Sequence, residues 1–375
     1  MKHTIFTPYR VCPLGAHVDH QLGQVTGFAI DRGVELEFDI TEDGTFDLIS
    51  KNYPGHIMFT LEDELEREML WGDFLKAAIV ALSRKYELRR GIKGVIEGTL
   101  PVGGLSSSAA VILTYLNAVC IANDIQITRP EIISNAIWAE RNYIGVNVGK
   151  LDQSCEVYCR KNGLLFLDTL DDSNEIIPVS SNMNPFEIMI VFGGKERQLA
   201  GSAYNTRVDE CKAAAYALQA YAGMDYGNYK DTYLRNVPIG VYLQYKDRLP
   251  ENWRKRAEHF YGERQRVKDG IKAWKKGDIE EFGQLMFQSR RSSIELYETG
   301  SDNLRDLQDI FENTDGIYGG RFSGAGFNGS SIALINPDKK EEIADKVRKE
   351  YIKRHPNLEK DFAIYFVNTA DGIKL

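Results

Sequence analysis

The chain has 375 residues, enough for two domains of moderate size, and its 43% hydrophobic and 27% charged content is normal for a folded protein. The formal net charge of −8, with Lys and Arg spread along the chain, argues against a nucleic-acid-binding protein. No apolar run approaches the roughly 20 residues of a membrane span, and no secretion signal is visible at the N-terminus. Five cysteines without a CxxC pair favour reduced thiols, so we expect a cytoplasmic protein. From the charge and from the lack of a long apolar run, we expect neither nucleic-acid nor membrane partners.

The first half of the chain predicts short strands and amphipathic helices. Alternating or short apolar runs predict strands at 4–11, 33–40, 91–100 and 162–169. Apolar residues at helical spacing predict helices at 71–86, after the serines of 106–108, and at 128–142.

The second half has the same mixture. Strands are predicted at 186–194, 330–337 and 361–369, and helical patterns at 202–221, 253–298 and 338–355. Strands and helices without regular βαβ alternation indicate an α+β fold. The polar, acidic stretch at 169–184 suggests domains at 1–178 and 179–375, with a return of the final strand to the N-terminal domain left open.

The stretch PVGGLSSSAA, residues 101–110, joins a predicted strand to a predicted helix. A flexible linker is disfavoured because structured segments abut it directly. Gly103 and Gly104 permit positive φ angles, and serines commonly cap the free N–H groups of a helix. A glycine-rich turn that opens onto a helix N-terminus also binds anions, so the residues alone leave a plain cap and a phosphate site open.

Two other strings imitate nucleotide motifs without their context. GAGFNG at 324–329 satisfies GxGxxG, but a predicted strand follows it where a dinucleotide fold needs a helix. GVNVGK at 145–150 has three residues between its glycines instead of four, and Leu151 replaces the expected Ser or Thr. Neither string supports its motif.

Glu140 occupies an unusual place for a carboxylate. It shares a helical face with Ile133 and Ile137, which precede it by seven and three residues. A carboxylate on an apolar face is costly unless it is paired or bound to a metal. The position therefore predicts a metal ligand, a buried ion pair or a frayed helix end.

Several segments, in sequence order, resemble motifs of the GHMP small-molecule kinases, galactokinase branch. RVCPLGAHVDHQLG at 10–23 resembles the galactokinase signature, PVGGLSSSAA the phosphate loop, GKLDQ at 149–153 the stretch with the catalytic aspartate, and GGRFSGAGFNGSS at 319–331 the C-terminal glycine-rich motif. GSAYNTR and KKGDIEEFGQLM resemble further galactokinase segments. The resemblance implies a two-domain α+β fold, with an N-terminal ribosomal-S5-like domain, a C-terminal ferredoxin-like α/β sandwich and the active site between them.

The resemblance also implies ATP and Mg²⁺ as cofactors. By this resemblance, Ser108 and Glu140 would contact the metal. A single carboxylate is sufficient, because Mg²⁺ needs only one or two carboxylates besides the phosphates. Trp71 would line the adenine pocket, although a core tryptophan fits the sequence equally well. The implied ATP contacts are Trp71, Gly103, Gly104, Leu105, Ser106, Ser107, Ser108 and Ala109.

Asp152 and Arg10 are the implied catalytic pair. A carboxylate within hydrogen-bond reach can accept the proton of a sugar hydroxyl as the phosphoryl group is transferred. A neighbouring guanidinium keeps that carboxylate ionised and stabilises the charge on the phosphoryl group. An isolated Asp is more often a turn or cap residue, and the GKLDQ motif favours the catalytic role. The implied sugar contacts are Ala16, His17, Asp19, Gly149, Lys150 and Tyr204.

The N-terminal motif departs from the galactokinase pattern at Ala16. Galactokinases have a Glu at this position, and the resemblance implies that this Glu contacts the sugar 6-hydroxyl. A second departure is His20, which stands where their motif has a Tyr. Losing the carboxylate removes an acceptor for a 6-hydroxyl and a repulsion against a 6-carboxylate, so Ala16 favours a uronic acid. The motif is similar to its plant galacturonokinase version. Candidate cations for a uronate carboxylate are Lys150, Lys195 and Arg197, each of which could equally be a surface charge.

Three hypotheses follow from these motifs. The first is an ATP-dependent kinase for the anomeric (C1) hydroxyl of galacturonate. The second is a galactokinase or a related neutral-sugar 1-kinase, for example one for L-arabinose. The third is a non-catalytic sugar and ATP sensor of galactokinase ancestry, which retention of Arg10 and Asp152 disfavours.

Overall fold

The computed structural model of the chain describes residues 2–100, 105–195, 201–225 and 227–375. Its larger sheet has eight strands, all antiparallel to their neighbours except for the parallel pair β3–β5. The strands are β1 His3–Val11, β2 Gln24–Thr41, β3 Thr45–Ser50, β4 His56–Thr60, β5 Gly91–Gly98, β6 Gly163–Asp168, β7 Asn174–Pro178 and β12 Thr369–Ala370. The long β2 pairs with β1, β5, β6 and β12, so it organises this sheet.

The smaller sheet is antiparallel in the order β11-β8-β10-β9. Its strands are β8 Glu187–Gly193, β9 Ile317–Phe322, β10 Ser330–Ile335 and β11 Phe362–Val367. Alternate residues of β8 enter different cores. Met189 packs in the cluster that includes residues of α9 and α10, whereas Ile190 belongs to the large core shared with the first sheet.

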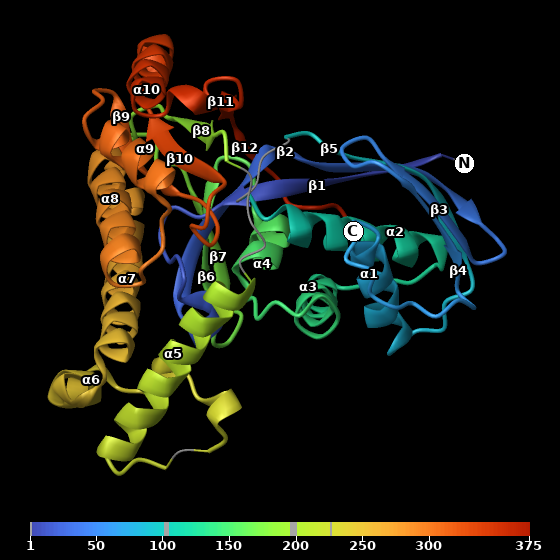
Figure 1. Cartoon of the computed structure of the whole chain (residues 1–375), viewed down its shortest axis with the longest axis horizontal. Helices are drawn as coiled ribbons and strands as arrows, with labels where there is room; N and C mark the ends of the chain where they lie inside the picture. The colour runs from blue at the N-terminus through green and yellow to red at the C-terminus, as the bar shows by residue number, and fades with distance from the viewer. Residues whose placement is uncertain (1, 101–104, 196–200, 226) are drawn as a thin grey trace.

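Two groups of helices lie at different ends of the molecule (Figure 1). α1 to α4 gather beside β1, β2 and β5, and α7 and α8 run antiparallel at the opposite end of the molecule. Their bounds are α1 Asp73–Ser83, α2 Ser107–Ala122, α3 Arg129–Trp138, α4 Leu151–Tyr158, α5 Gly201–Tyr221, α6 Ile239–Tyr245, α7 Glu251–Lys276, α8 Ile279–Glu295, α9 Asp302–Glu312 and α10 Lys340–Arg354.

Most predicted elements are present, and one predicted helix was wrong in extent. The pattern at 253–298 forms two helices, α7 and α8, because Gly277 takes φ 80 at the end of α7. Asp278 then caps α8, accepting a hydrogen bond from the Glu281 N–H at 2.8 Å. The strands β3, β4, β7 and β9 and the helices α4, α6 and α9 were not predicted.

The chain passes between the two sheets twice. β7 ends at Pro178 and β8 begins at Glu187, near the boundary at 178/179, which stays a prediction. After β11 the chain leaves the smaller sheet, and β12 pairs with β2 through Thr369 and Ile30. Within the described ranges, no helix has the length and apolar character needed to cross a membrane.

Candidate functional site

The end of β1 and the first turn of α4 bring Arg10 and Asp152 together across 142 residues of sequence. Nε and Nη2 of Arg10 lie 2.8 and 2.7 Å from Oδ1 of Asp152. Burial alone would lower the pKa of Arg10, but the Asp152 charge outweighs it and raises that pKa. Nη1 of Arg10 also donates to Oγ of Ser323, just beyond β9, at 3.2 Å. The guanidinium is therefore fixed from both parts of the chain.

A second carboxylate, Asp19, lies beside the start of α4. It begins the short 3₁₀ turn η1 (Asp19–Gln21), and its Oδ2 accepts the Leu151 N–H at 3.2 Å. A Cβ at Gly149 would lie 1.9 Å from that same oxygen, so only glycine permits this approach. Burial, with the nearby Asp152 charge, raises the pKa of Asp19. Two carboxylates, Asp19 and Asp152, thus lie close together at the start of α4.

The histidines around Asp19 are buried and neutral. The backbone of His17 has a positive φ of 61, and its ring stacks on Tyr297 with the ring centroids 4.4 Å apart. Nε2 of His20 lies 2.9 Å from the Tyr297 hydroxyl. Burial lowers the pKa of His17 well below its usual value and that of His20 to about 3. Nε2 of His17 is buried without a hydrogen-bond partner among the described residues, so this loop retains an unused polar atom.

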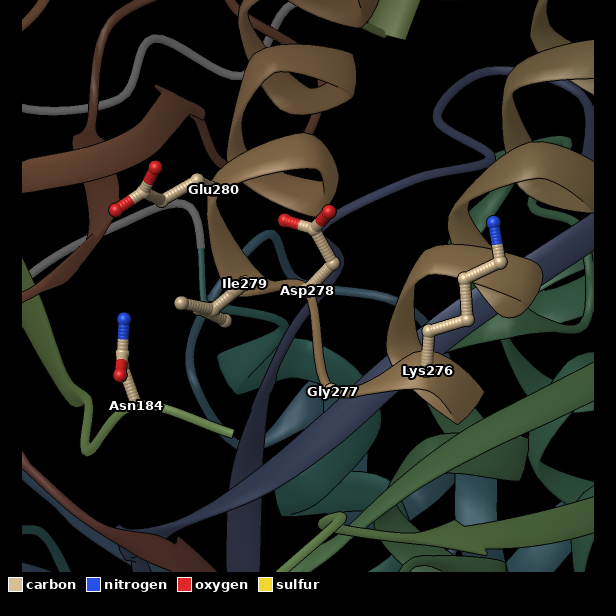
Figure 2. Close-up of a pocket in the computed structure, with 6 residues that line it drawn as sticks. All are labelled: Asn184, Lys276, Gly277, Asp278, Ile279 and Glu280. Carbon is tan, nitrogen blue, oxygen red and sulfur yellow. The ribbon is translucent and has the colours of Figure 1, made fainter. Parts of the chain in front are cut away.

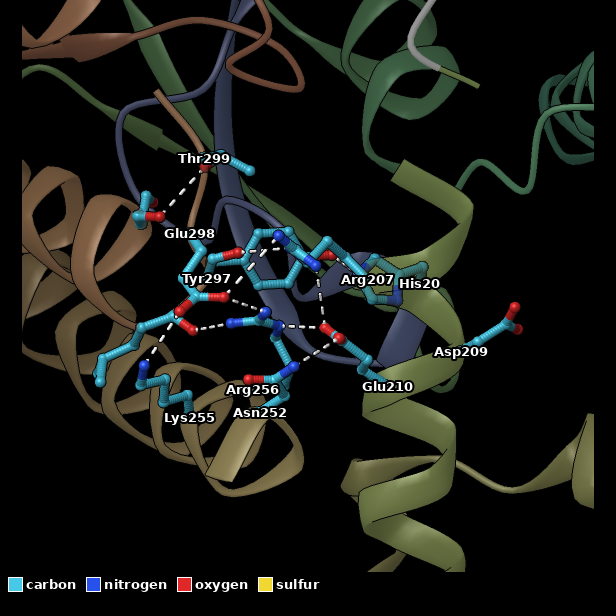
Figure 3. A network of polar contacts seen from close by, with 12 residues as sticks. His20, Arg207, Asp209, Glu210, Asn252, Lys255, Arg256, Tyr297, Glu298 and Thr299 are labelled. Atoms are coloured by element: carbon cyan, nitrogen blue, oxygen red, sulfur yellow. Dashed lines mark hydrogen bonds and ion pairs between the residues drawn. The ribbon is translucent and has the colours of Figure 1, made fainter. Parts of the chain in front are cut away.

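A network of ion pairs fixes Tyr297 behind this loop (Figure 3). Nε of Arg207 donates to the Tyr297 carbonyl at 3.1 Å. The fully buried Arg256 donates at 2.6 Å to both Glu210 and Glu298. α5, α7 and the segment after α8 are thereby joined at one point, as Figure 3 shows.

Tyr204 projects from the same helix as Arg207, about one turn earlier. Its ring meets the edge of His20, with centroids 6.0 Å apart. Burial raises the pKa of Tyr204 well above its usual value, so its hydroxyl stays protonated. Next to it, Asn205 accepts the Asn147 N–H at 3.3 Å, which joins α5 to the loop before α4.

The serine loop and Glu140 meet at the start of α2. The Ser108 hydroxyl donates to Oε1 of Glu140 at 3.0 Å, and Gln153 donates to Oε2. Glu140 is only 4% exposed, as expected from its apolar face, but it lies in a π-helical turn, Ala139–Ile144, rather than in α3. Such turns often occur at functional sites.

The expected serine cap is not formed at the N-cap of α2. Ser106 has φ 64, and its side chain makes no capping hydrogen bond. Leu105 is buried, and its carbonyl accepts the Arg10 N–H at 3.3 Å, which joins the loop to β1. Ser107 is half-buried and Ala109 is buried. Gly103 and Gly104 lie outside the described residues.

Comparison with known proteins assigns this arrangement to a family. Residues 73–160 match the GHMP kinases N terminal domain, and residues 271–353 match the GHMP kinases C terminal. The galacturonokinase of Arabidopsis thaliana is 36% identical over 392 aligned residues, covering 99% of this chain and 90% of that protein.

The chain belongs to the GHMP kinase family. A galactokinase of Thermosipho africanus is 30% identical, covering 98% of this chain and 97% of that protein. The crystal structure of Lactococcus lactis galactokinase complexed with galactose matches with a TM-score of 0.90 at 29% identity, covering 100% of this chain and 95% of that one.

This GHMP kinase is thus a sugar kinase of the galactokinase and galacturonokinase type, an enzyme that uses ATP as phosphoryl donor. A mevalonate kinase of Methanococcus jannaschii shares the fold at 17% identity, with a TM-score of 0.67. The two-domain GHMP fold inferred from the motifs is confirmed.

The positions of the remaining predicted ATP and sugar contacts give less support to their predicted roles. Trp71 is half-buried before α1 and donates from Nε1 to the Pro54 carbonyl at 3.2 Å, so a nucleotide role and a packing role both fit. Lys150 forms an ion pair with Asp172, away from the buried carboxylates. Lys195 is exposed after β8, and Arg197 lies outside the described residues.

Sequence reasoning missed several residues that support the site. Ser323 lies in the C-terminal glycine-rich motif, and Gln153 follows Asp152, so both could have been found from the motifs. His259 and Glu263 of α7 also contact the loop around Ala16. Their only sequence signal is a spacing of four residues on a predicted helix.

Other candidate ligand sites do not compete with this one. The pocket in Figure 2 lies at the turn between α7 and α8, where Asp278 already serves as a helix cap. Among the described residues, no cluster of three His, Cys, Asp or Glu side chains could hold a metal alone.

Proposed function

We propose that this kinase transfers the γ-phosphoryl group of ATP, with Mg²⁺, to the anomeric (C1) hydroxyl of galacturonate. A bond forms between O1 of the sugar and the γ-phosphorus, and the bond from that phosphorus to the β,γ-bridging oxygen breaks. The products are galacturonate 1-phosphate and ADP. The hydroxyl proton passes to Asp152.

The observation that carries the choice of substrate is Ala16. It is buried in the loop that also holds His17 and Asp19, where the galactokinase motif has a Glu. A Glu at this position would face a sugar 6-carboxylate with like charge, whereas Ala leaves space without charge. The similarity to a galacturonokinase at 36% identity supports the same choice.

The catalytic roles rest on the Arg10–Asp152 pair. Arg10 holds Oδ1 of Asp152 with two donors, which fixes the position of the carboxylate that would act as general base. The side chain of Asp152 remains 27% exposed, so a substrate hydroxyl can reach it. In the transition state the same guanidinium stabilises charge on the transferring group.

The sugar itself would be held by the residues around Asp19. A buried carboxylate accepts hydrogen bonds from ring hydroxyls, and Nε2 of the nearby His17 has no hydrogen-bond partner within the described chain. Gly149 allows close approach, and the neutral Tyr204 hydroxyl can donate. Lys150, paired with Asp172, is the weakest of these proposed contacts.

The donor side fits ATP and Mg²⁺. Ser108 and Glu140 already meet at 3.0 Å, and this hydroxyl with one carboxylate is a ligand set that Mg²⁺ accepts alongside phosphates. Bound there, Mg²⁺ would neutralise charge on the β- and γ-phosphates. Leu105 to Ala109 would supply backbone N–H groups to the phosphates, together with Gly103 and Gly104.

A coupled ADP-release assay on a panel of free sugars tests this proposal. The panel contains galacturonate, glucuronate, galactose and L-arabinose, each with ATP and Mg²⁺. We expect turnover of galacturonate and much weaker turnover of the neutral sugars. Efficient turnover of galactose without galacturonate would instead support a galactokinase, and tight binding of sugar and ATP without turnover would support a sensor.

A further inference from the structure

We propose that His259 and Glu263, both on α7, are positioning residues that hold the backbone on either side of Ala16. This inference rests on the proposed function, because it assumes that the loop around Ala16 receives the sugar. Neither residue belongs to a motif considered above, and neither contacts Asp152 or Arg10 in the hydrogen bonds of the described chain. Their role would be to fix the geometry of the acceptor site from outside it.

His259 holds the carbonyl of Ala16. Its Nε2 lies 3.0 Å from that oxygen, and its Nδ1 lies 2.8 Å from the Ser292 hydroxyl. A carbonyl can only accept, so Nε2 carries the proton and Nδ1 accepts from Ser292. The ring is fully buried, and burial lowers its pKa to about 4. The Ala16 carbonyl therefore selects the tautomer, and Ser292 orients the ring by donating to Nδ1.

Glu263 holds the N–H that precedes Ala16. Its Oε1 accepts the Gly15 N–H at 2.8 Å and the Ser289 hydroxyl at 2.6 Å. Its Oε2 accepts from Nε of Arg266 at 2.6 Å. Burial would raise the pKa of this carboxyl, but Arg266, His259 and Arg321 outweigh it and lower the pKa to about 2. Glu263 is thus an ionised anchor, which makes strong hydrogen bonds.

The two contacts together leave the loop little freedom. His259 and Glu263 are four residues apart on α7, so they share one face of the helix. Between their contacts, Gly15 has φ +95, and a Cβ there would lie 2.5 Å from Cα of Val25. The 14–15 and 16–17 peptide groups are therefore held, which restricts the backbone on both sides of residue 16 and with it the direction of its side chain.

The same buried network reaches the catalytic pair. Arg321 of β9 donates to the Ser289 hydroxyl at 2.5 Å and lies 3.9 Å from Oε1 of Glu263. Two residues later, the Ser323 hydroxyl accepts from Arg10. One strand end thus contacts both the anchor of the Ala16 loop and the guanidinium beside Asp152. Sugar and base are positioned by the same set of buried groups.

Three variants on α7 test the proposal. His259→Phe keeps a buried ring but removes both hydrogen bonds, His259→Gln keeps a donor of similar reach, and Glu258→Gln changes the exposed neighbour as a control. We expect His259→Phe to raise the KM for the sugar about tenfold or more, because a loop that is no longer held displaces the groups that contact the substrate. The KM for ATP should stay within about twofold, His259→Gln should recover most of the loss, and the control should match the parent.

A folded His259→Phe protein with an unchanged sugar KM would overturn the proposal. If that variant does not fold, Ser292→Ala removes the hydrogen bond that orients the His259 ring, with little change in packing, and an unchanged sugar KM in Ser292→Ala overturns the proposal as well. All values are measured with whichever sugar the parent enzyme prefers. A preference for galactose therefore counts against the proposed substrate only, whereas an α7 variant without effect counts against the positioning role only.

Discussion

Arg10 directs two donors, Nε and Nη2, to a single oxygen of Asp152, Oδ1, at 2.8 and 2.7 Å. Among the described residues, Oδ2 of Asp152 has no hydrogen-bond partner, and the side chain is 27% exposed. The pair therefore divides the carboxylate into a fixed oxygen and a free one. The free oxygen is the one that a sugar hydroxyl could use, since a base needs an unoccupied lone pair.

Asp152→Asn tests that division. The amide keeps the size of the side chain but cannot take up a proton, and general-base catalysis typically contributes about 10²–10⁴-fold. We expect kcat to fall by roughly that factor while the KM for ATP stays within about twofold. Asp345→Asn, a change to an exposed carboxylate on α10, is the matched control. An equal loss of ATP affinity would contradict the role of Asp152 as base.

Ala16→Glu tests the charge argument at the acceptor site. The new carboxylate would repel a uronate and offer an acceptor to a 6-hydroxyl. We expect kcat/KM for galacturonate to fall at least about tenfold more than that for galactose, measured by steady-state kinetics on both sugars. Ala16→Gln is the neutral control of the same size. A larger loss for galactose than for galacturonate would refute the repulsion.

Glu140→Gln tests the proposed metal contact. The amide preserves the shape beside Ser108 and Gln153 but removes the charge that a divalent cation needs. We expect the Mg²⁺ concentration for half-maximal rate to rise about tenfold or more, with sugar affinity little changed. Titration of the rate with Mg²⁺ at fixed ATP measures this. The exposed Glu64→Gln variant should behave as the parent, and identical Mg²⁺ curves for all three proteins would exclude Glu140 as a ligand.

Glu156 predicts a dependence of stability on pH. It lies one turn after Asp152 on α4, fully buried, and neither carboxyl oxygen has a hydrogen-bond partner among the described residues. Burial raises its pKa well above the usual value, and the Asp152 charge adds to the effect. The folded state therefore keeps a proton that the unfolded chain has released above about pH 4.5. Folding takes up a proton there, so stability falls as the pH rises from about 4.5 toward the folded-state pKa.

Glu156→Gln removes that proton uptake. We expect the free energy of unfolding of the variant at pH 8 to exceed that of the parent by about 1–3 kcal/mol, the usual cost of an unsatisfied buried polar group. This difference should shrink as the pH falls toward 4. Urea unfolding at several pH values measures both. A gain of equal size at pH 4 and pH 8 would show that Glu156 does not titrate in this way.

The motifs predicted which residues meet, and the structure supplied what holds them. The family resemblance implied that Arg10 lies beside Asp152 and that Ser108 and Glu140 share a metal, and in the structure each of these two pairs is in hydrogen-bond contact. Periodicity could not locate the break at Gly277, because the apolar pattern continues across it and only the positive φ ends the helix. The short strands β3 and β4 likewise depend on pairing with β5 rather than on local pattern.

The supporting residues were hidden for a different reason. His259 and Glu263 lie some 240 residues from the loop that they hold, and they contact its backbone rather than its side chains. Backbone contacts leave no complementary residue in the sequence of the loop. Lys150 was a candidate cation for a uronate carboxylate, but in the structure it forms an ion pair with Asp172. A single sequence does not show which neighbour a surface lysine will pair with.

The central claim is that the enzyme selects galacturonate, and a direct competition tests it. Equimolar galacturonate and galactose are incubated with ATP, Mg²⁺ and the enzyme, and the two sugar 1-phosphates are quantified by NMR at low conversion. Their ratio gives the ratio of kcat/KM values, which we expect to favour galacturonate by at least about tenfold. A mixture dominated by galactose 1-phosphate would contradict the account.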